Sequence, residues 1–242
     1  QLQTELIAKG YKNASNNKTL NIFKHMFTKA VDWNMVEEDT LKRVRKVKLF
    51  KEDNRLRYIS KEECQSLINV CDSHLKPIVT TALNTGMRKG EILNLQWDNV
   101  DLTHGFILLD ITKNGERREI PINNTLRQTF KGIVRRLDCP YVFYLHEEGK
   151  RYQDVRRSFK TALRKAKIQD FHFHDLRHTF ASHLVMAGVD ITTVSRLLGH
   201  KKLTMTLRYS HLAPAHLHKA VDMLDNVLNE KPTAQFSAQS AL

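Results

Sequence analysis

The chain has 242 residues, which is enough for one large or two small domains with a hydrophobic core. Its formal net charge of +13 and its pI of about 9.7 indicate a polyanionic partner, with nucleic acid the first candidate and a basic protein without such a partner the alternative. No apolar run is long enough to span a bilayer, and the three cysteines lack metal-ligand spacing, so we expect reduced thiols in a cytoplasmic protein.

The N-terminal region is predicted to be a small helical piece followed by a basic linker. Residues 1 to about 35 are predicted as helical because apolar side chains recur with a 3.6-residue period, at Leu20, Phe23, Met26, Phe27, Ala30 and Val31. Residues 41–57 then carry eight Lys or Arg against two acids. Such a charge run between two apolar-periodic regions is typical of a solvated linker.

A larger domain is predicted to begin near Tyr58. Ser60 followed by Glu63 is the pattern of a capping box, which opens a helix. A second helix is expected at residues 76–84, where the chain is again apolar, and the Gly86 that follows is a helix-ending residue.

The next helix is predicted to start at Arg88, within the string Thr85-Gly86-Met87-Arg88-Lys89-Gly90-Glu91-Ile92-Leu93. The free amides at a helix start favour an anion. Glu91 lies on the same helix face as Arg88 and can orient its guanidinium group. Taken alone, an ordinary surface ion pair is the commoner explanation of this spacing.

The sequence has one clear β region. Residues 105–111 are predicted as a strand and residues 117–122 as the return strand, because Asn114-Gly115 between two such runs is a strong hairpin signal. Helices are then predicted at residues 126–137 and 155–166, with a short third strand at residues 141–144. The expected fold class is therefore α+β, mainly α with a small antiparallel β-sheet.

Residues 171–209 contain three short helical patterns separated by glycines. In the first, Leu176, Phe180 and Leu184 recur at i, i+4 and i+8, which predicts a buried stripe. The side chains expected on the opposite face are His174, Arg177, His178 and Ala181. Gly188 stands where that helix would end.

The second of these patterns is predicted to be capped by Asp190 and to end at Gly199, directly before His200. A third short helix would carry Arg208 and Tyr209. Together the three patterns would present polar and reactive side chains from helix faces and ends around one small core.

The ordered set of these motifs resembles the active site of the tyrosine recombinases, the phage-integrase family. That family has H-x-x-R, then G-H, then a tyrosine, which here are His174 to Arg177, Gly199-His200 and Tyr209. The string around Arg88 matches the family's first arginine motif. Each motif alone would be weak evidence, but their order and spacing make the set specific.

The resemblance implies a domain organisation. A partial helical core-binding domain would occupy residues 1–40, a basic linker residues 41–57, the catalytic domain residues 58–230 and a flexible tail residues 231–242. We expect the chain to begin inside the core-binding domain or to carry a reduced version of it. A helix expected from Pro214 onward would dock either on a neighbouring protomer or on its own domain.

The resemblance also implies a role for each motif residue. Tyr209 would attack a DNA phosphodiester and form a 3′-phosphotyrosyl bond, so that strands are cleaved and rejoined without metal, cofactor or ATP. Arg88 and Arg177 would hold the phosphate oxygens, and His200 would hydrogen-bond to them. His174 would accept the tyrosine proton. Lys113, on the hairpin, would protonate the leaving 5′-oxygen. Glu91 and Asp175 would support the catalytic residues without contacting the DNA.

The expected partner is double-stranded DNA with specific recombination sites, bound by a homo-oligomer that is tetrameric at synapsis. The linker would then run along phosphates. The side chains expected to contact them are Lys42, Arg43, Arg45, Lys46, Lys48, Arg55 and Arg57.

Three other functions share parts of this pattern. A metalloenzyme would use His174 and His178, which are spaced like part of a zinc motif, but no third ligand stands out in the sequence. Tyr209 beside Arg208 and the placement of Lys113 argue against a DNA-binding module without catalysis. A type IB topoisomerase shares the chemistry but relaxes supercoils, and the G-H followed by R-Y spacing favours a recombinase.

Overall fold

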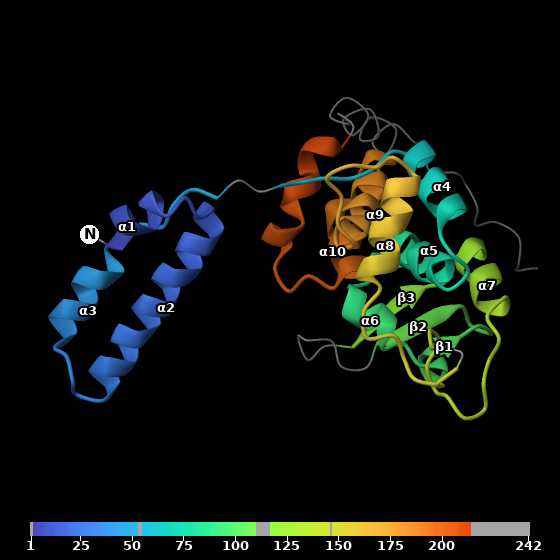
Figure 1. Ribbon diagram of the computed structural model, residues 1–242, viewed down its shortest axis with the longest axis horizontal. Helices are drawn as coiled ribbons and strands as arrows, with labels where there is room; N and C mark the ends of the chain where they lie inside the picture. The colour runs from blue at the N-terminus through green and yellow to red at the C-terminus, as the bar shows by residue number, and fades with distance from the viewer. Residues whose placement is uncertain (1, 53–54, 110–116, 146, 214–242) are drawn as a thin grey trace, which may run out of the picture. The chain divides into compact units, whose positions relative to one another are not determined.

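The computed structural model describes residues 2–52, 55–109, 117–145 and 147–213. The chain divides into two compact units, an N-terminal unit of residues 1–55 and a C-terminal unit of residues 56–242 (Figure 1). Among the helices that the structure describes, none is both long and apolar enough to cross a bilayer.

The N-terminal unit consists of helices α1 (Leu2–Ala8), α2 (Asn13–Asp32) and α3 (Glu38–Arg45). Leu6, Leu20 and Leu41 are its buried hydrophobic side chains among the described residues. The predicted helical region is confirmed, but the periodic Phe23 and Met26 are exposed. The periodicity therefore indicated a helix correctly without indicating which side chains are buried.

The segment expected as a linker begins inside α3 and is then held against α2 by polar side chains. The buried Asn17 both accepts a hydrogen bond from the backbone N–H of Phe50 and donates one to its carbonyl, each over 2.8 Å. Lys24 donates to the carbonyl of Val47 over 2.6 Å, and Asn13 donates to that of Lys51 over 2.9 Å. Residues 47–51 thus follow the surface of α2.

The C-terminal unit opens with α4 (Lys61–Val70), and the predicted capping box between Ser60 and Glu63 is present. Its other α-helices are α5 (Leu75–Thr85), α6 (Lys89–Leu93), α7 (Asn124–Lys131), α8 (Arg156–Lys165), α9 (Asp175–Met186) and α10 (Ile191–Leu198). Short 3-10 turns are η1 (Trp97–Asn99), η2 (Leu203–Met205) and η3 (Leu207–Leu212). Helix α5 packs against α9 and α7, so it lies at the centre of the unit.

A three-stranded antiparallel sheet of β1 (Val100–Asp101), β2 (Phe106–Leu109) and β3 (Arg118–Pro121) forms the other part of this unit. Ile107 lies opposite Ile120, and both are buried. In Figure 1, α8, α9 and α10 lie together, and the sheet lies below them beside α6. The predicted α+β class, mainly helical with a small antiparallel sheet, is confirmed.

Two sequence predictions for this unit were wrong. The third strand is β1, whereas the segment predicted as a strand at residues 141–144 makes isolated bridges from Tyr141 to Gln96 and from Tyr144 to Arg151. The helix predicted at residues 126–137 ends at Lys131, because Gly132 and the β-branched residues after it favour helix termination. Apolar content was therefore a poor guide to short elements.

The two faces of α9 are also less distinct than predicted. Leu176 is fully buried, but Phe180 and Leu184 are only partly buried. On the expected polar face, His174 is exposed but Arg177, His178 and Ala181 are buried. This happens because α9 packs against α5 and also against α10 and η3. Ala181, Val185, Val194, Leu198 and Tyr209 form a small core beside α9, separate from the main core of the unit.

Candidate active site

Arg88 and Glu91 form the first part of the site. Arg88 is the N-cap of α6, and its backbone N–H donates to Glu91 Oε2 over 2.9 Å. Its guanidinium donates from Nη1 to Glu91 Oε1 over 2.7 Å, so Glu91 orients this arginine as the sequence predicted. Burial alone would raise the pKa of Glu91, but Arg118 and Arg88 hold it below its usual value.

Arg118, at the start of β3, completes this ion-pair network. Its side chain is only 6% exposed, and its Nη2 atom lies 2.7 Å from Glu91 Oε2. Nη1 donates to the carbonyl of Leu198 at the end of α10. Arg118 was not predicted as a site residue. It lies two residues before Ile120 in a strand, so both side chains point to the same buried face, and a charged residue on such a face was a usable signal.

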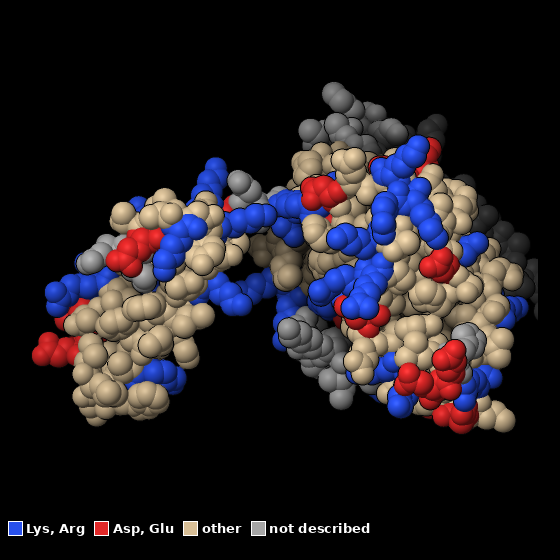
Figure 2. Space-filling view, in the orientation of Figure 1, with Lys and Arg blue, Asp and Glu red and all other residues tan. Residues whose placement is uncertain are grey.

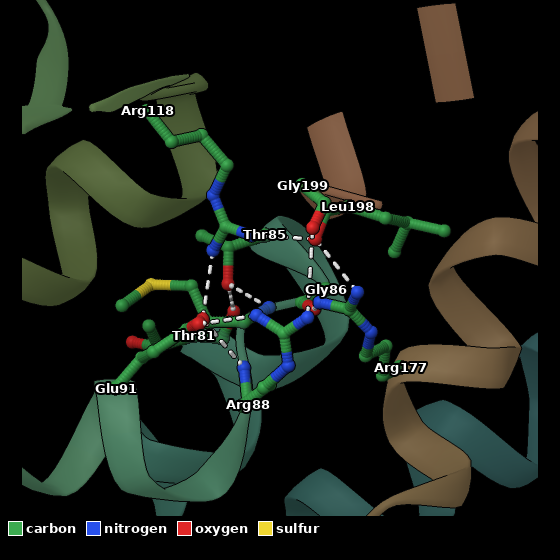
Figure 3. Close-up of polar contacts among 10 residues, drawn as sticks. Thr81, Thr85, Gly86, Arg88, Glu91, Arg118, Arg177, Leu198 and Gly199 are labelled. Atoms are coloured by element: carbon green, nitrogen blue, oxygen red, sulfur yellow. Dashed lines mark hydrogen bonds and ion pairs between the residues drawn. The ribbon is translucent and has the colours of Figure 1, made fainter. Parts of the chain in front are cut away.

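Arg177 reaches the same carbonyl from α9. Nη2 donates to Leu198 O and Nη1 donates to Gly86 O, both over 2.6 Å (Figure 3). Burial, followed by the charges of Arg88 and Arg118, lowers the pKa of Arg177 to about 10, so it remains a cation at neutral pH. Three guanidinium groups therefore lie near one carboxylate, so this cluster of described side chains carries two more positive charges than negative ones.

Gly199 allows the arginines to approach the end of α10 this closely. Its φ of +64° is the left-handed conformation that closes a helix, and the following His200 N–H donates back to Ser195 O. A Cβ at this position would also lie 2.9 Å from Arg118 Cδ. Both the backbone and the space therefore require glycine here.

The two predicted histidines flank the arginines. His200 accepts or donates a hydrogen bond at Nδ1 with Thr206 Oγ1 over 2.7 Å, and burial followed by the charge of Arg177 lowers its pKa to about 4. His174 directly precedes α9, and desolvation followed by the charge of Arg177 lowers its pKa. Both imidazoles are thus neutral hydrogen-bonding groups at pH 7 beside fixed cations.

Tyr209, the predicted nucleophile, lies in η3 and is only 1% exposed. Its hydroxyl oxygen lies 2.6 Å from His178 Nδ1, and burial raises the pKa of the phenol although Arg208 and Arg177 act in the opposite direction. The sequence predicts His178 on the face of α9 opposite the apolar stripe, but the only role that it suggests for His178 is metal binding. His178, which contacts the tyrosine hydroxyl, directly follows Arg177 on α9.

Comparison with known proteins identifies the family of this chain. The model of the phage integrase family matches residues 57–216. The chain belongs to the phage integrase family. It is 31% identical over 210 residues to the integrase of Salmonella phage P22, covering 81% of this chain and 53% of that protein. It is 31% identical over 236 residues to a tyrosine recombinase of Pyrococcus furiosus, covering 93% of this chain and 80% of that protein.

The chain spans about half the length of the first relatives it matches, which include the phage P22 integrase and a shufflon-specific recombinase of Escherichia coli. Among solved structures, the catalytic domain of bacteriophage HP1 integrase is 30% identical, with a TM-score of 0.59, and the match covers 73% of this chain and 99% of that domain. The Tn1549 transposon integrase in complex with circular-intermediate DNA has a TM-score of 0.73 at 19% identity, covering 93% of this chain and 82% of that one, a similarity that shows the fold.

The remaining integrase-family residues predicted from the sequence fall into two groups. Lys113, and the helix expected from Pro214 onward, lie outside the described residues. Asp175 is buried and its carboxylate accepts from the His172 backbone N–H over 2.7 Å, so it supports the loop before α9.

The basic linker side chains are largely exposed. Six of the seven, Lys42, Arg43, Arg45, Lys46, Lys48 and Arg55, are exposed, and Arg57 is partly buried over the ring of Phe171. A second exposed basic set, which sequence analysis did not include, lies on α8: Arg156, Arg157, Lys160, Arg164 and Lys165. Figure 2 shows Lys and Arg gathered on the face of the C-terminal unit that carries α8.

The metal-binding alternative finds no support in the geometry. Within the described ranges, no three His, Cys, Asp or Glu side chains are grouped so that they could hold a metal ion. The rings of His174 and His178 are edge-to-face with centroids 5.2 Å apart, and the Nδ1 atom of His178 is engaged by Tyr209.

Proposed function

We propose that this chain cleaves and rejoins DNA strands at specific recombination sites through a 3′-phosphotyrosyl intermediate at Tyr209. Membership of the phage integrase family supports the reaction class. The observation that carries the proposal is the convergence of Arg88 and Arg177, from separate helices, on the carbonyls of Gly199 and Leu198, beside a buried tyrosine.

The excess positive charge of this cluster suits a phosphodiester. Paired N–H donors of a guanidinium match two phosphate oxygens, and donors fixed in advance stabilise the extra negative charge of the pentacoordinate transition state. Glu91 orients Arg88, and the carbonyls of Gly86 and Leu198 orient Arg177, before DNA binds. The arginines can therefore supply the charge stabilisation that this reaction requires.

The proposed step forms a bond between Tyr209 Oη and phosphorus and breaks the bond between phosphorus and the 5′-oxygen. The phenol loses its proton to a base, and the departing 5′-oxygen gains one from Lys113, the proposed acid. His200 donates a hydrogen bond to a phosphate oxygen, and Asp175 supports the helix that carries Arg177. Attack by another 5′-hydroxyl on the phosphotyrosyl bond reverses these changes and joins the new strand, so no ATP is consumed.

The proposed partner is double-stranded DNA bound by several copies of the chain, with a tetramer at synapsis. A lambda integrase dimer bound to a core site, with a TM-score of 0.69 at 20% identity, shows that a protein of this fold assembles on DNA. The exposed basic side chains of α3, the segment after it and α8 are suited to phosphate contacts. Three unpaired thiols, at Cys64, Cys71 and Cys139, fit the proposed cytoplasmic location.

Covalent capture tests this proposal. The protein is incubated with a library of duplexes whose central sequence is randomised, the mixture is denatured in detergent, and DNA attached to protein is recovered and sequenced. We expect enriched sequences joined to a peptide containing Tyr209 through a 3′-phosphate. Recovery of no more DNA than from the Tyr209→Phe protein would contradict the proposed chemistry. Relaxation of supercoiled plasmid without exchange between two selected sites would indicate a topoisomerase instead.

A further inference from the structure

His178 is the residue that contacts the proposed nucleophile. Its Nδ1 atom lies 2.6 Å from the Tyr209 hydroxyl oxygen, and both side chains are buried. His178 and Tyr209 lie on α9 and η3, two elements that pack directly on each other. The ring centroid of His178 lies 5.2 Å from that of His174, in an edge-to-face contact, and 5.8 Å from that of Tyr209.

The chemistry of the two groups fixes the direction of this hydrogen bond. Burial, followed by the proximity of His174 and Arg208, lowers the pKa of His178 to about 4, so the ring is neutral at pH 7. Burial keeps the phenol protonated at the same pH. A phenol O–H is a much stronger acid than a neutral imidazole N–H, so Tyr209 donates and His178 Nδ1 accepts, with the ring proton on Nε2.

We propose that His178, and not His174, accepts the phenol proton when Tyr209 attacks the phosphodiester; this rests on the proposed function. As the bond between Oη and phosphorus forms, the O–H proton passes to Nδ1 and His178 becomes an imidazolium. The bond between phosphorus and the 5′-oxygen breaks, and that oxygen takes a proton from a separate acid. The imidazolium returns its proton to Oη when the phosphotyrosyl bond is broken in the rejoining step.

The charges around His178 make it a base only when DNA is present. From its own helix it faces His174, Asp175 and Arg177, and from η3 it faces Arg208. Burial, followed by these charges, holds the ring neutral in the free protein. A phosphate bound between the arginines adds negative charge next to these cations, which raises the proton affinity of His178 at the moment of attack. The free protein therefore keeps Tyr209 both buried and protonated.

The test compares rates of covalent-complex formation on a selected duplex that carries sulfur at the bridging 5′ position. A thiolate leaves without a proton, so this substrate isolates the activation of Tyr209. His178→Asn places an amide oxygen near the position of Nδ1, where it can still accept a hydrogen bond but cannot take the proton. His183→Asn is the matched control, because His183 is on the same helix and hydrogen-bonds through Nε2 to the carbonyl of Ile59.

We expect His178→Asn to slow cleavage at neutral pH by about 10²–10⁴-fold without weakening DNA binding, which is the usual contribution of general base catalysis. Its rate should rise in proportion to hydroxide, because only pre-ionised tyrosine can then attack, whereas the wild-type rate should level off. His183→Asn should retain the wild-type profile. An undiminished rate or an unchanged pH profile for His178→Asn would overturn the proposal, as would a hydroxide-dependent profile for His174→Asn alone.

A measurement on the DNA-free wild-type protein separates this inference from the proposed function. In ¹⁵N imidazole NMR, one histidine should carry its proton on Nε2, with Nδ1 as an acceptor, and its signal should shift in Tyr209→Phe. A protonated Nδ1 at His178 would overturn the proton-acceptor role whether or not His178→Asn folds. If wild type forms no covalent complex, both proposals fail; if it does and only the His178 readouts fail, the proposed function stands.

Discussion

The N-terminal unit leaves apolar side chains exposed, whereas the C-terminal unit buries charged ones. On α2, Met26 is 58% exposed, and Trp33 directly after this helix is 69% exposed, while Arg177 on α9 is only 4% exposed. A buried cation is tolerated only where it is paired and hydrogen-bonded, and the carbonyls of Gly86 and Leu198 supply those partners. The comparison shows that the buried, paired charges lie in the C-terminal unit, while exposed basic side chains occur in each unit.

The largest expected effect is that of replacing Tyr209, the proposed nucleophile in the C-terminal unit. Tyr209→Phe should remove the covalent protein–DNA complex entirely but leave DNA binding almost intact, because one hydroxyl adds little to an interface dominated by phosphate contacts. Detergent gels measure the adduct, and electrophoretic mobility shifts measure binding. A covalent band that persists in this variant would assign the nucleophile to another residue.

The next prediction concerns Lys113, which belongs to the C-terminal unit but lies outside the described residues. If it protonates the leaving 5′-oxygen, Lys113→Ala should slow cleavage by about 10²–10⁴-fold at nearly unchanged DNA affinity. A substrate with bridging 5′-sulfur should restore most of that rate. Arg88→Ala is the matched control, and it should not recover because it loses charge stabilisation. Equal rescue of both variants, or of neither, would contradict this division of roles.

Ion pairs in the two units should differ sharply in their contribution to stability. Arg118 pairs with Glu91 at 6% and 13% side-chain exposure, whereas Arg43 pairs with Asp39 at 71% and 68%. Arg118→Met should lower the free energy of unfolding by about 3–5 kcal/mol, the usual cost of removing one partner of a buried pair. Arg43→Met should have little measurable effect, because exposed pairs are screened by solvent.

Urea denaturation of the two variants measures this difference. The transition of the C-terminal unit is followed by the fluorescence of Trp97, which is buried there, because Trp33 of the N-terminal unit is already 69% exposed and changes less on unfolding. If Arg118→Met proves as stable as Arg43→Met, the network around Glu91 is held by Arg88 alone.

The smallest expected effect concerns the basic segment of the N-terminal unit. If the exposed Lys46 and Lys48 contact phosphates, replacing both with Gln should reduce the slope of log Kd against log salt concentration by about 0.9 for each lost contact. Lys9→Gln with Lys18→Gln removes the same charge from exposed positions elsewhere in that unit. Equal flattening by both pairs would mean that only the total charge matters.

Local signals in the sequence determined the helix ends and the identity of the motif residues. The capping box at Ser60, the cap at Asp190 and the helix end at Gly199 were all predicted and are all present, because each depends on side-chain and backbone preferences within a few residues. The pairing of Arg88 with Glu91 was predictable for the same reason, since the two lie one helical turn apart. Family membership followed from the order of such local motifs.

Contacts between residues distant in the chain were decided only by the tertiary structure. Arg118 joins Glu91 and the end of α10 from a strand, and His178 meets Tyr209 across 31 residues of sequence. Periodicity reports which residues share a face of a helix, but not what packs on that face, so Arg177 and His178 on the expected polar face of α9 proved to be buried. The contact of His178 with the tyrosine hydroxyl therefore depends on the packing of α9 against η3, which the sequence alone did not predict.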